Sequence, residues 1–321
     1  MTPRKCLFCR KPLPETGPTD FHTTCSQKFF GSPQPPVLPY SLDSLHELAE
    51  QIVQRSIAVV GVQPKLSLGF ERATKNGPSR LTLVGTMGHF ILKPPHAHYP
   101  ELVENEHLTM QLATHFGLPT VPFSFVRLAS GELAYITRRI DRLPNGAKLP
   151  MEDFCQLTER LTEYKYRASM EQVGKALRRY SSVPGLDAVR LFEQALFVFL
   201  TGNADMHLKN FSLLTAVDGT IALAPAYDMV ATKLAMPDDP EELALTLNGK
   251  KNKLRLADFL AFAEALQLPA KTVSNTLAHF RKKLPGVHAL LEQSELSREA
   301  RNALEALISE RADRLNLANE N

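Results

Sequence analysis

Two acidic residues and one amide have the types and spacing best suited to chemistry in this chain. Asp205 and Asn210 stand in the relation Asp-x-x-x-x-Asn between two apolar stretches, and a further carboxylate, Asp228, follows the short apolar run 221–224. Phosphoryl transfer requires a carboxylate near the attacking hydroxyl, and an amide oxygen and a second carboxylate that hold Mg²⁺ on the phosphates. The pattern therefore predicts Asp205 as a catalytic base and Asn210 and Asp228 as magnesium ligands.

A lysine is expected to complete such a site, because nucleotide phosphates carry several negative charges. Lys93 follows the apolar run 89–92, where an ammonium group can project from the end of a strand. Glu104 and Glu106 come next, on a segment with helical periodicity, and either carboxylate could orient the lysine. We expect Lys93 to contact phosphate, with one of these two acids holding it in place.

A loop that could cover the phosphates precedes this lysine. It spans residues 60–65, and its candidate nucleotide-binding residues are Gly61, Val62, Gln63 and Lys65. The loop has a single glycine, so it is neither a Walker motif nor the glycine-rich loop of typical protein kinases. By itself it is a weak signal.

Six short motifs, taken in order, resemble the HipA family of bacterial toxin kinases and cover residues 56–230. They are Gly61-Val-Gln-Pro-Lys65, Phe90-Ile-Leu-Lys-Pro94, Glu104-Asn-Glu106, Arg138-Arg-Ile-Asp-Arg142, Gly202-Asn-Ala-Asp-Met-His-Leu-Lys-Asn210 and Tyr227-Asp228. The resemblance implies an α+β, two-lobed, protein-kinase-like fold with a small strand-rich lobe and a larger helical lobe. It also implies ATP and Mg²⁺ as cofactors, and transfer of phosphate to a serine of a protein such as an aminoacyl-tRNA synthetase, which inhibits translation.

The same resemblance gives roles to single residues. It implies that Lys93 binds phosphate, that Glu106 pairs with it, and that Asp205 is the base. It places the adenine against the backbone of the hinge from Arg138 to Ile140. His207 is a nucleotide-binding candidate by position, although a histidine there more often orients the loop.

The chain departs from the family pattern before the phosphate loop. Full-length members carry an extra N-terminal subdomain, whereas about 55 residues precede the loop here. The chain thus resembles the short kinase HipT of HipB–HipS–HipT systems, in which a separate small protein corresponds to that subdomain. This likeness implies a HipB-like helix-turn-helix antitoxin and a HipS-like protein as partners, with DNA contacted only through the antitoxin.

A second departure concerns autophosphorylation. Members of the family phosphorylate a serine just before the loop glycine. In this sequence Ser56 lies further from Gly61, and Ala58 is nearer the usual position. Ser56 is therefore the candidate site.

Three of the four cysteines lie near the N-terminus, together with a histidine. Cys6 and Cys9 form one close pair, and His22 and Cys25 form another. Two close pairs of such ligands fit a tetrahedral structural Zn²⁺ with no open position. We expect zinc rather than a disulfide, because a module this small needs a staple and the expected compartment is reducing. The alternative is three free thiols and a surface histidine.

Composition is typical of a globular enzyme. The chain has 321 residues, 44% of them hydrophobic and 22% charged, and a net charge of +3. This balance argues against a protein that mainly coats nucleic acid or an anionic membrane. The N-terminus lacks the apolar core of a signal peptide, and nothing reaches the length of a membrane span, so we expect a cytoplasmic protein without membrane contact.

Periodicity indicates the elements that position these residues. The expected elements are helices over 42–53 and 102–116, strands over 81–84 and 89–92 joined by a tight turn, and hairpins over 121–140 and around 218–219. Elsewhere after residue 151 the pattern is helical. The expected domains are a Cys-rich module with a proline-rich linker (1–39), a small lobe (40–140) and a large lobe (141–321).

Two other functions remain open. The same lobes could phosphorylate a sugar, lipid or antibiotic hydroxyl instead of a protein. Alternatively, the chain could be a non-catalytic, DNA-associated module built around the zinc site, although it lacks the basic stripe that autonomous DNA binding requires. The sequence does not identify the phosphorylated protein, the neutralising partner or the oligomeric state.

Overall fold

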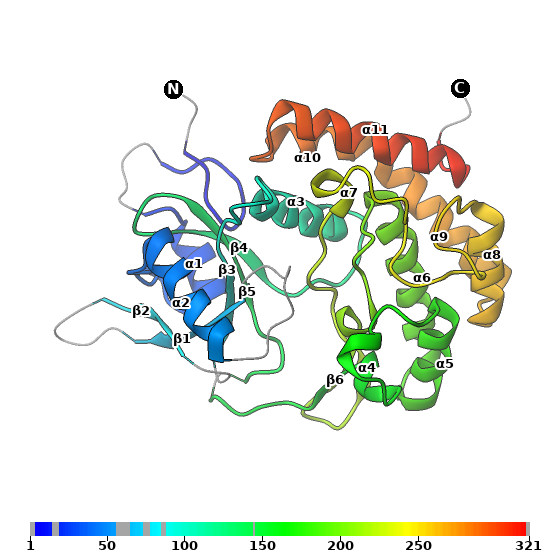
Figure 1. Ribbon diagram of the computed structural model, residues 1–321, viewed down its shortest axis with the longest axis horizontal. Helices are drawn as coiled ribbons and strands as arrows, with labels where there is room; N and C mark the ends of the chain where they lie inside the picture. The colour runs from blue at the N-terminus through cyan, green and yellow to red at the C-terminus, as the bar shows by residue number, and fades with distance from the viewer. Residues whose placement is uncertain are drawn as a thin grey trace. The chain divides into compact units, whose positions relative to one another are not determined.

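The structure of this protein, a computed structural model, covers two compact units. It describes residues 4–14, 19–55, 65–72, 78–84, 88–143 and 145–318, and for residues 49–55 the backbone only. Unit 1 comprises Met1–His107 and Val121–Ala147, and unit 2 comprises Leu108–Thr120 and Lys148–Asn321 (Figure 1). Helix α3 (Leu102–His115) contributes residues to both units.

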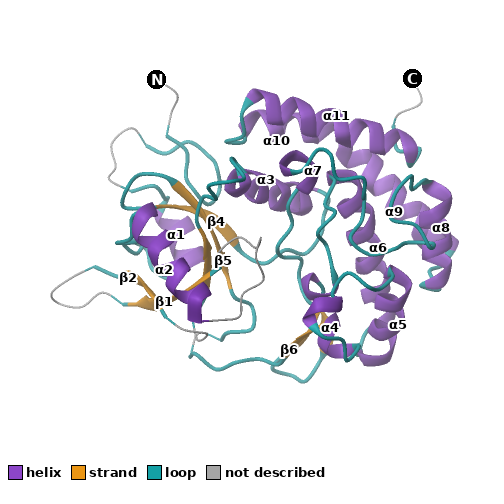
Figure 2. Cartoon of the chain, in the orientation of Figure 1, coloured by secondary structure: helices purple, strands orange, loops and turns teal. Residues whose placement is uncertain are grey.

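A five-stranded antiparallel sheet is the framework of unit 1. Its strands are β1 (Leu66–Glu71), β2 (Arg80–Leu83), β3 (Phe90–Lys93), β4 (Phe123–Arg127) and β5 (Leu133–Arg138), drawn in orange in Figure 2. The order is β2-β1-β3-β5-β4. The expected hairpin over 121–140 is present as β4 and β5. Strand β3, which ends in Lys93, lies in the middle of the sheet between β1 and β5.

Strands β2 and β3 do not form the tight hairpin that their sequences suggested. Strand β1 lies between them and pairs with both, so that Leu68 is opposite Leu83 on one side and Phe90 on the other. Leu66 and Leu68 of β1 are buried at alternate positions, as a strand with one buried face requires. The periodicity analysis missed this strand, and with it the true neighbour of β3.

Two helices precede the sheet. Helix α2 (Leu42–Arg55) begins after Ser41, whose hydroxyl oxygen accepts a hydrogen bond from the backbone N–H of Ser44 at 3.3 Å. Helix α1 (Thr23–Phe30) ends in two buried rings, Phe29 and Phe30. Both rings pack against Phe90 of β3, with centroids 5.7 Å apart. The Cys-rich segment therefore shares its core with the sheet and is counted with unit 1.

Unit 2 is mainly helical. Its helices are α4 (Phe154–Leu157), α5 (Met170–Tyr180), α6 (Pro184–Thr201), α7 (Thr232–Ala235), α8 (Leu256–Ala265), α9 (Ala270–Lys283), α10 (Val287–Gln293) and α11 (Arg298–Arg314). Helix α6 is central: its second half is almost fully buried, and it packs against α5, α8 and α11. None of the described helices is both long and apolar enough to span a membrane.

A small antiparallel sheet has two of its three strands between Asn210 and Asp228 along the chain. It consists of β6 (Met151–Asp153), β7 (Ser212–Thr215) and β8 (Ile221–Leu223), in that order. The hairpin expected around 218–219 joins β7 and β8. The expectation of helix throughout the rest was wrong in three places: β6 is a strand, residues 158–169 form turns and one short 3-10 helix, and residues 236–255 form turns and isolated bridges.

Candidate functional site

Lys93 and Glu106 form a buried ion pair in unit 1. The Nζ atom of Lys93 lies 2.6 and 2.7 Å from the two carboxylate oxygens of Glu106, and the side chains are 4% and 1% exposed. Of the two acids considered from the sequence, it is thus Glu106 that holds the lysine. Glu104 lies elsewhere on α3, where burial raises the pKa of its carboxyl group. Because either charge would be costly to bury alone, the pair fixes the direction of the ammonium group.

Neighbouring strands restrict Lys93 further. Lys93 is opposite Tyr135 in the pairing of β3 with β5. The Nζ atom lies 5.5 Å from the centre of the Tyr135 ring, within the range of a cation–π contact. The lysine is therefore held by a carboxylate and an aromatic face, both in the core of unit 1.

The expected hinge, residues 138–140, begins at the last residue of β5. The backbone N–H of Arg138 donates to the Pro122 oxygen and that of Arg139 to the His89 oxygen. Ile140 comes next and is half-buried. Asp141 then accepts hydrogen bonds from Arg139 and Arg142. Burial opposes ionisation of Asp141, but the two guanidinium groups outweigh it and hold its pKa below the usual value.

The phosphate loop cannot be placed in the same way. Gly61, Val62 and Gln63, and the candidate autophosphorylation site Ser56, lie outside the described residues. Lys65 is described and is exposed just before β1. The role of these residues stays a prediction.

In unit 2, buried amides present the carboxylate of Asp205 to solvent. The side-chain oxygen of Asn203 accepts a hydrogen bond from the Asp205 N–H at 3.0 Å. The side-chain nitrogen of Asn210 donates to the Asp205 carbonyl oxygen at 3.1 Å. Asn203 and Asn210 are 1% and 6% exposed, whereas Asp205 is exposed. The Asp-x-x-x-x-Asn spacing thus allows Asn210 to close the loop by a hydrogen bond to the backbone of the candidate base.

The 202–210 loop begins at Gly202, a position that favours glycine. Gly202 ends helix α6 in the left-handed region, with φ of 71°. A Cβ atom there would lie 2.6 Å from Leu307 of α11 and 3.0 Å from the Cβ of Lys233. Thr232 adds a bridge, because its hydroxyl donates to the Gly202 oxygen at 3.1 Å and accepts from the Ala204 N–H at 2.8 Å.

Asp228 is brought to the same loop by its neighbours. The Tyr227 hydroxyl donates to the Lys209 oxygen at 3.1 Å and lies 2.5 Å from the Ser212 hydroxyl, and Thr232 holds the other end of the loop. Asp228 itself has φ of 59°. A non-glycine residue in this region costs about 1–3 kcal/mol, but seven other described non-glycine residues also have positive φ, so this conformation does not by itself mark a functional site.

Two ring side chains flank Asp205. His207 is buried, which lowers its pKa, and its Nδ1 atom has no hydrogen-bond partner among the described residues. The Tyr166 hydroxyl donates to the Asp205 carboxylate. The Tyr166 ring meets the His207 ring edge-on, with centroids 5.0 Å apart. Sequence reasoning missed Tyr166, because it lies outside the six motifs, in a segment where only helix was expected.

The oxygen donors of unit 2 suit a hard cation. Asn210 offers an amide oxygen and Asp228 a carboxylate, the ligand types that Mg²⁺ prefers when it keeps several waters. Lys93 and Glu106 belong to unit 1, and Asp205, His207, Asn210 and Asp228 to unit 2. Each unit thus carries one of the two expected sets of residues.

A separate cluster, the Cys/His cluster, consists of Cys6, Cys9, His22 and Cys25. The ligand atoms of the four lie within 4.8 Å of one another, and within the described ranges no other group of three or more such side chains gathers this closely. The Nδ1 atom of His22 lies 3.4 Å from the Cys9 sulfur and 3.8 Å from the Cys25 sulfur. Its Nε2 atom lies 3.0 Å from the Pro12 oxygen, the outer contact that orients many metal-binding histidines.

The thiols of this cluster do not ionise alike. Burial opposes ionisation of Cys6, but N–H donors at Cys9, His22 and Phe8 outweigh it and lower its pKa to about 7. Burial and the neighbouring sulfurs raise the pKa of Cys25 to about 12. The fourth cysteine, Cys155, is buried in unit 2.

Comparison with known proteins matches residues 57–287 to a family model described as the HipA-like C-terminal domain. A putative kinase, Y4mE, of Sinorhizobium fredii is 32% identical over 236 residues, which are 71% of this chain and 53% of the relative. A putative kinase of Haemophilus influenzae is 26% identical over 84% of this chain and 86% of its own length. The serine/threonine-protein kinase toxin HipA of Shewanella oneidensis is 27% identical over 71% and 56%. The chain spans little more than half the length of the first and last of these relatives.

Two solved structures share the fold. One is HipA of Shewanella oneidensis in complex with HipB and operator DNA, with a TM-score of 0.64, 21% identity, and coverage of 84% of this chain and 70% of that chain. The other is the proinflammatory kinase CtkA of Helicobacter pylori, with a TM-score of 0.54, 16% identity, and coverage of 78% and 93%. The expected α+β, protein-kinase-like fold is thereby confirmed. The match to more than half of the residues shows that this chain belongs to the HipA family, as a member with the HipA-like C-terminal domain.

Proposed function

We propose that this chain is an ATP-dependent serine/threonine protein kinase. The observation that carries the proposal is the 202–210 loop, in which two buried asparagines hold an exposed carboxylate in a chain of this family. Asp205 accepts the proton of the attacking hydroxyl. Asn210 and Asp228 hold Mg²⁺ on the nucleotide.

Each residue then has a distinct task. Lys93, kept in place by Glu106, contacts the phosphates and offsets their charge. Asp205 directs the hydroxyl oxygen toward the γ-phosphorus and removes its proton as the new bond forms. When bound, Mg²⁺ neutralises charge on the phosphate oxygens. The backbone after Arg138, together with Ile140, receives the adenine, while His207 orients the loop from its buried position.

The proposed substrate is a serine of a protein such as an aminoacyl-tRNA synthetase, so that the chain acts as the toxin of a toxin–antitoxin system in the cytoplasm and inhibits translation. A relative named as a toxin kinase and a neighbour solved with HipB and DNA support this assignment. The proposed partners are a HipB-like antitoxin, through which DNA is contacted, and a HipS-like small protein. Ser56 is the proposed autophosphorylation site, and phosphate mapping of the wild type and Ser56→Ala tests it.

Replacing Asp205 by asparagine tests the kinase assignment. The variant keeps the size of the side chain and loses the proton acceptor, so phosphorylation and toxicity are expected to fall to background while the protein stays folded. Phosphoproteomics after brief induction of the wild type and Asp205→Asn measures this. A phosphopeptide that depends on Asp205 identifies the substrate protein.

Other outcomes are equally informative. Full activity of Asp205→Asn would remove Asp205 as the base. If the wild type labels no protein but consumes ATP in a lysate fraction free of macromolecules, the alternative of a small-molecule hydroxyl kinase replaces the proposal.

For the Cys/His cluster we propose a structural Zn²⁺. Three sulfurs and one imidazole nitrogen, already within 4.8 Å of one another, form a closed tetrahedral ligand set. The contact of His22 with the Pro12 oxygen leaves Nδ1 to face the sulfurs. Metal analysis of natively purified protein is expected to give about one equivalent of zinc. Protein that is folded and free of zinc would contradict the proposal.

A further inference from the structure

Tyr166 contacts the candidate base, although it belongs to none of the motifs. Its hydroxyl donates a hydrogen bond to the Oδ1 atom of Asp205. A carboxylate has two oxygens, and each can accept a hydrogen bond. With Oδ1 occupied by the phenol, Oδ2 is the oxygen that can take the proton of an acceptor hydroxyl.

The position of Tyr166 is fixed by the backbone on either side. The Lys165 oxygen accepts a hydrogen bond from the Leu208 N–H at 3.2 Å, inside the 202–210 loop. The Ala168 oxygen accepts from the Thr246 N–H, also at 3.2 Å. The Tyr166 ring rests edge-on against the buried His207. The segment around Tyr166 is therefore held against the 202–210 loop by its backbone, and we expect it to stay in place when a substrate binds.

The phenol can act only as a donor to this carboxylate. Burial, the hydrogen bond to Asp205 and the negative charge of that residue all raise the pKa of Tyr166 above its ordinary value of 10.0. The hydroxyl therefore keeps its proton throughout the pH range in which a kinase works. A permanent donor on one oxygen limits rotation of the carboxylate and keeps the other oxygen in one place.

We propose that Tyr166 is a positioning residue that orients the Asp205 carboxylate for phosphoryl transfer. The proposal rests on the function proposed for Asp205. Tyr166 does not touch the reacting atoms, so its loss should lower kcat while the KM for MgATP stays nearly constant. A residue needed only for folding would instead lower the amount of active protein.

The test compares Tyr166→Phe with Tyr164→Phe. Tyr164 is a matched control, because it lies in the same segment with nearly the same exposure (38% against 39%) and contacts Arg167 instead of Asp205. Transfer from labelled MgATP is measured into the chain itself and into the lysate proteins that the wild type labels. For Tyr166→Phe we expect kcat to fall by about tenfold to a hundredfold, the usual effect of losing a hydrogen bond to a charged group, with KM for MgATP within about twofold. Tyr164→Phe is expected to match the wild type.

A second variant separates the hydrogen bond from the shape of the ring. Difluorotyrosine at position 166 keeps the ring and the hydroxyl, but its phenol is a stronger acid. At low pH it donates as tyrosine does, and at higher pH it ionises and repels Asp205. We expect kcat of the difluorotyrosine variant to fall at alkaline pH, in a range where kcat of the wild type does not fall. This measurement does not require Tyr166→Phe to fold well.

The outcomes distinguish the two proposals. If Asp205→Asn is fully active, the assignment of the base fails. Asp205→Asn could be inactive while Tyr166→Phe keeps the wild-type kcat and the difluorotyrosine variant shows no extra loss of kcat at alkaline pH. In that case only the role of Tyr166 is overturned. A rise in kcat for Tyr166→Phe would also overturn it, because the hydroxyl would then be occupying the place of the acceptor.

Discussion

Lys93 can bind a phosphate in one place only if its ammonium group is fixed before the nucleotide arrives. Glu106 provides this by contacting the Nζ atom with both oxygens in the core of unit 1. Spacing alone left Glu104 and Glu106 open, and the resemblance to the HipA family indicated Glu106. Two residues apart on a helix, the two side chains point in very different directions, and in the structure Glu106 is the one that contacts Lys93. Tyr166 had no sequence signal at all, because its partner is 39 residues away along the chain.

Glu106→Gln is the variant that tests this pair. The substitution replaces the carboxylate that contacts the buried Lys93 ammonium group by a neutral amide. We expect a loss of about 3 kcal/mol in the free energy of unfolding, at the low end for a broken buried pair because the amide still accepts a hydrogen bond. The KM for MgATP should rise by about tenfold or more. Urea denaturation and ATP titration measure the two effects.

Glu104→Gln is the matched control on the same helix. Burial already disfavours the ionised form of Glu104, so removing its charge should change stability by less than about 0.5 kcal/mol. Equal effects of the two substitutions would mean that the pair has no special part in binding nucleotide.

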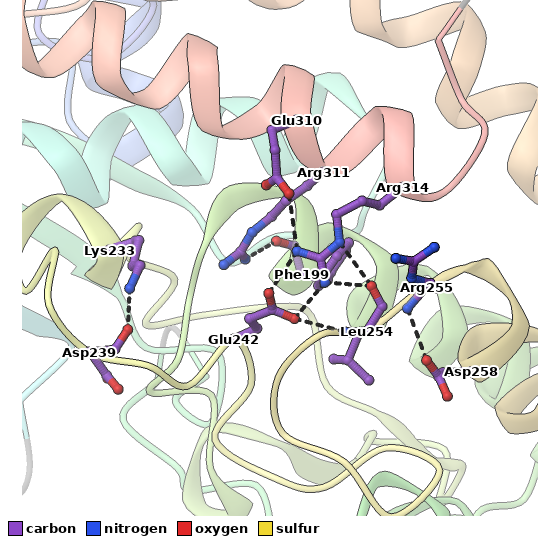
Figure 3. A network of polar contacts seen from close by, with 10 residues as sticks. All are labelled: Phe199, Lys233, Asp239, Glu242, Leu254, Arg255, Asp258, Glu310, Arg311 and Arg314. Atoms are coloured by element: carbon purple, nitrogen blue, oxygen red, sulfur yellow. Dashed lines mark hydrogen bonds and ion pairs between the residues drawn. The ribbon is translucent and has the colours of Figure 1, made fainter.

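Helix α11 holds the end of α6 through two arginines (Figure 3). Arg311 is 2% exposed and donates to the Phe199 oxygen, three residues before Gly202. Arg314 donates to both oxygens of Glu242 at 2.7 and 2.9 Å, and its Nε atom donates to the Leu254 oxygen at 3.0 Å. Through Arg311 and Arg314, helix α11 thus connects the irregular segment 236–255 to α6, the helix that leads into the 202–210 loop.

The contact between Glu242 and Arg314 predicts that the stability of the protein depends on pH. Burial opposes ionisation of Glu242, but the hydrogen bonds from Arg314 outweigh it and hold its pKa below the ordinary value of 4.5. The unfolded chain therefore takes up the proton first as the pH falls. The stabilisation is complete above about pH 4.5 and is lost as the pH falls toward the lower pKa of the folded protein.

Glu242→Gln isolates this effect. Near neutral pH the variant should be about 1–2 kcal/mol less stable than the wild type, and the difference should shrink as the pH falls below about 4.5. Free energies of unfolding from urea titrations at several pH values measure it. Glu310→Gln is the control, because Glu310 contacts the same arginine from a side chain that is 56% exposed, and it should have little effect. If the difference in the free energy of unfolding between Glu242→Gln and the wild type did not change with pH, the role assigned to the Glu242–Arg314 contact would be contradicted.

Elements with a continuous local signal were predictable. Helix α3 and both hairpins appear where periodicity and turn residues placed them, because those signals depend on residues close in the chain. Strand β1 was missed although Leu66 and Leu68 alternate with smaller residues, and its place between β2 and β3 is set by the pairing with both strands. The segment 236–255 was read as helical, yet it is held by side chains such as Glu242, which accepts the Leu254 N–H at 3.0 Å. No local pattern reports such a contact.

At the scale of the whole molecule, the chemical residues are divided between the two units, and the Cys/His cluster belongs to unit 1. The segment that carries the cluster contacts the sheet at several points, among them an ion pair between Asp20 and Arg127 of β4. Phe29 and Phe30 pack on Phe90 of β3, and the Leu7 oxygen accepts hydrogen bonds from the Phe125 N–H and the Ser124 hydroxyl of β4. Strand β3 also carries Lys93. Loss of the proposed Zn²⁺ should therefore weaken the strand that carries the proposed phosphate-binding lysine.

Removing zinc tests this coupling. After chelation, or in Cys25→Ala, hydrogen exchange should speed up in α1, β3 and β4, while α6 and α11 of unit 2 keep their protection, because the lost bonds all lie in unit 1. The KM for MgATP should rise as Lys93 loses its support. Cys155→Ala is the control, since it removes a buried thiol from unit 2 and leaves the cluster intact. Unchanged exchange in unit 1 after complete loss of zinc would contradict the structural role.

The close contact of α11 with Gly202 matters for the genetics of this chain. Leu307 fills the space beside Gly202, and Arg311 holds the turn of α6 before it, although α11 contains none of the six motifs. A stop codon or frameshift within 298–314 would leave every motif in place and still remove what supports the 202–210 loop. Such alleles would keep all six motifs and still encode an inactive protein. If the chain is a toxin, as proposed, mutants that escape its toxicity are expected to include lesions in this last helix as well as at Asp205.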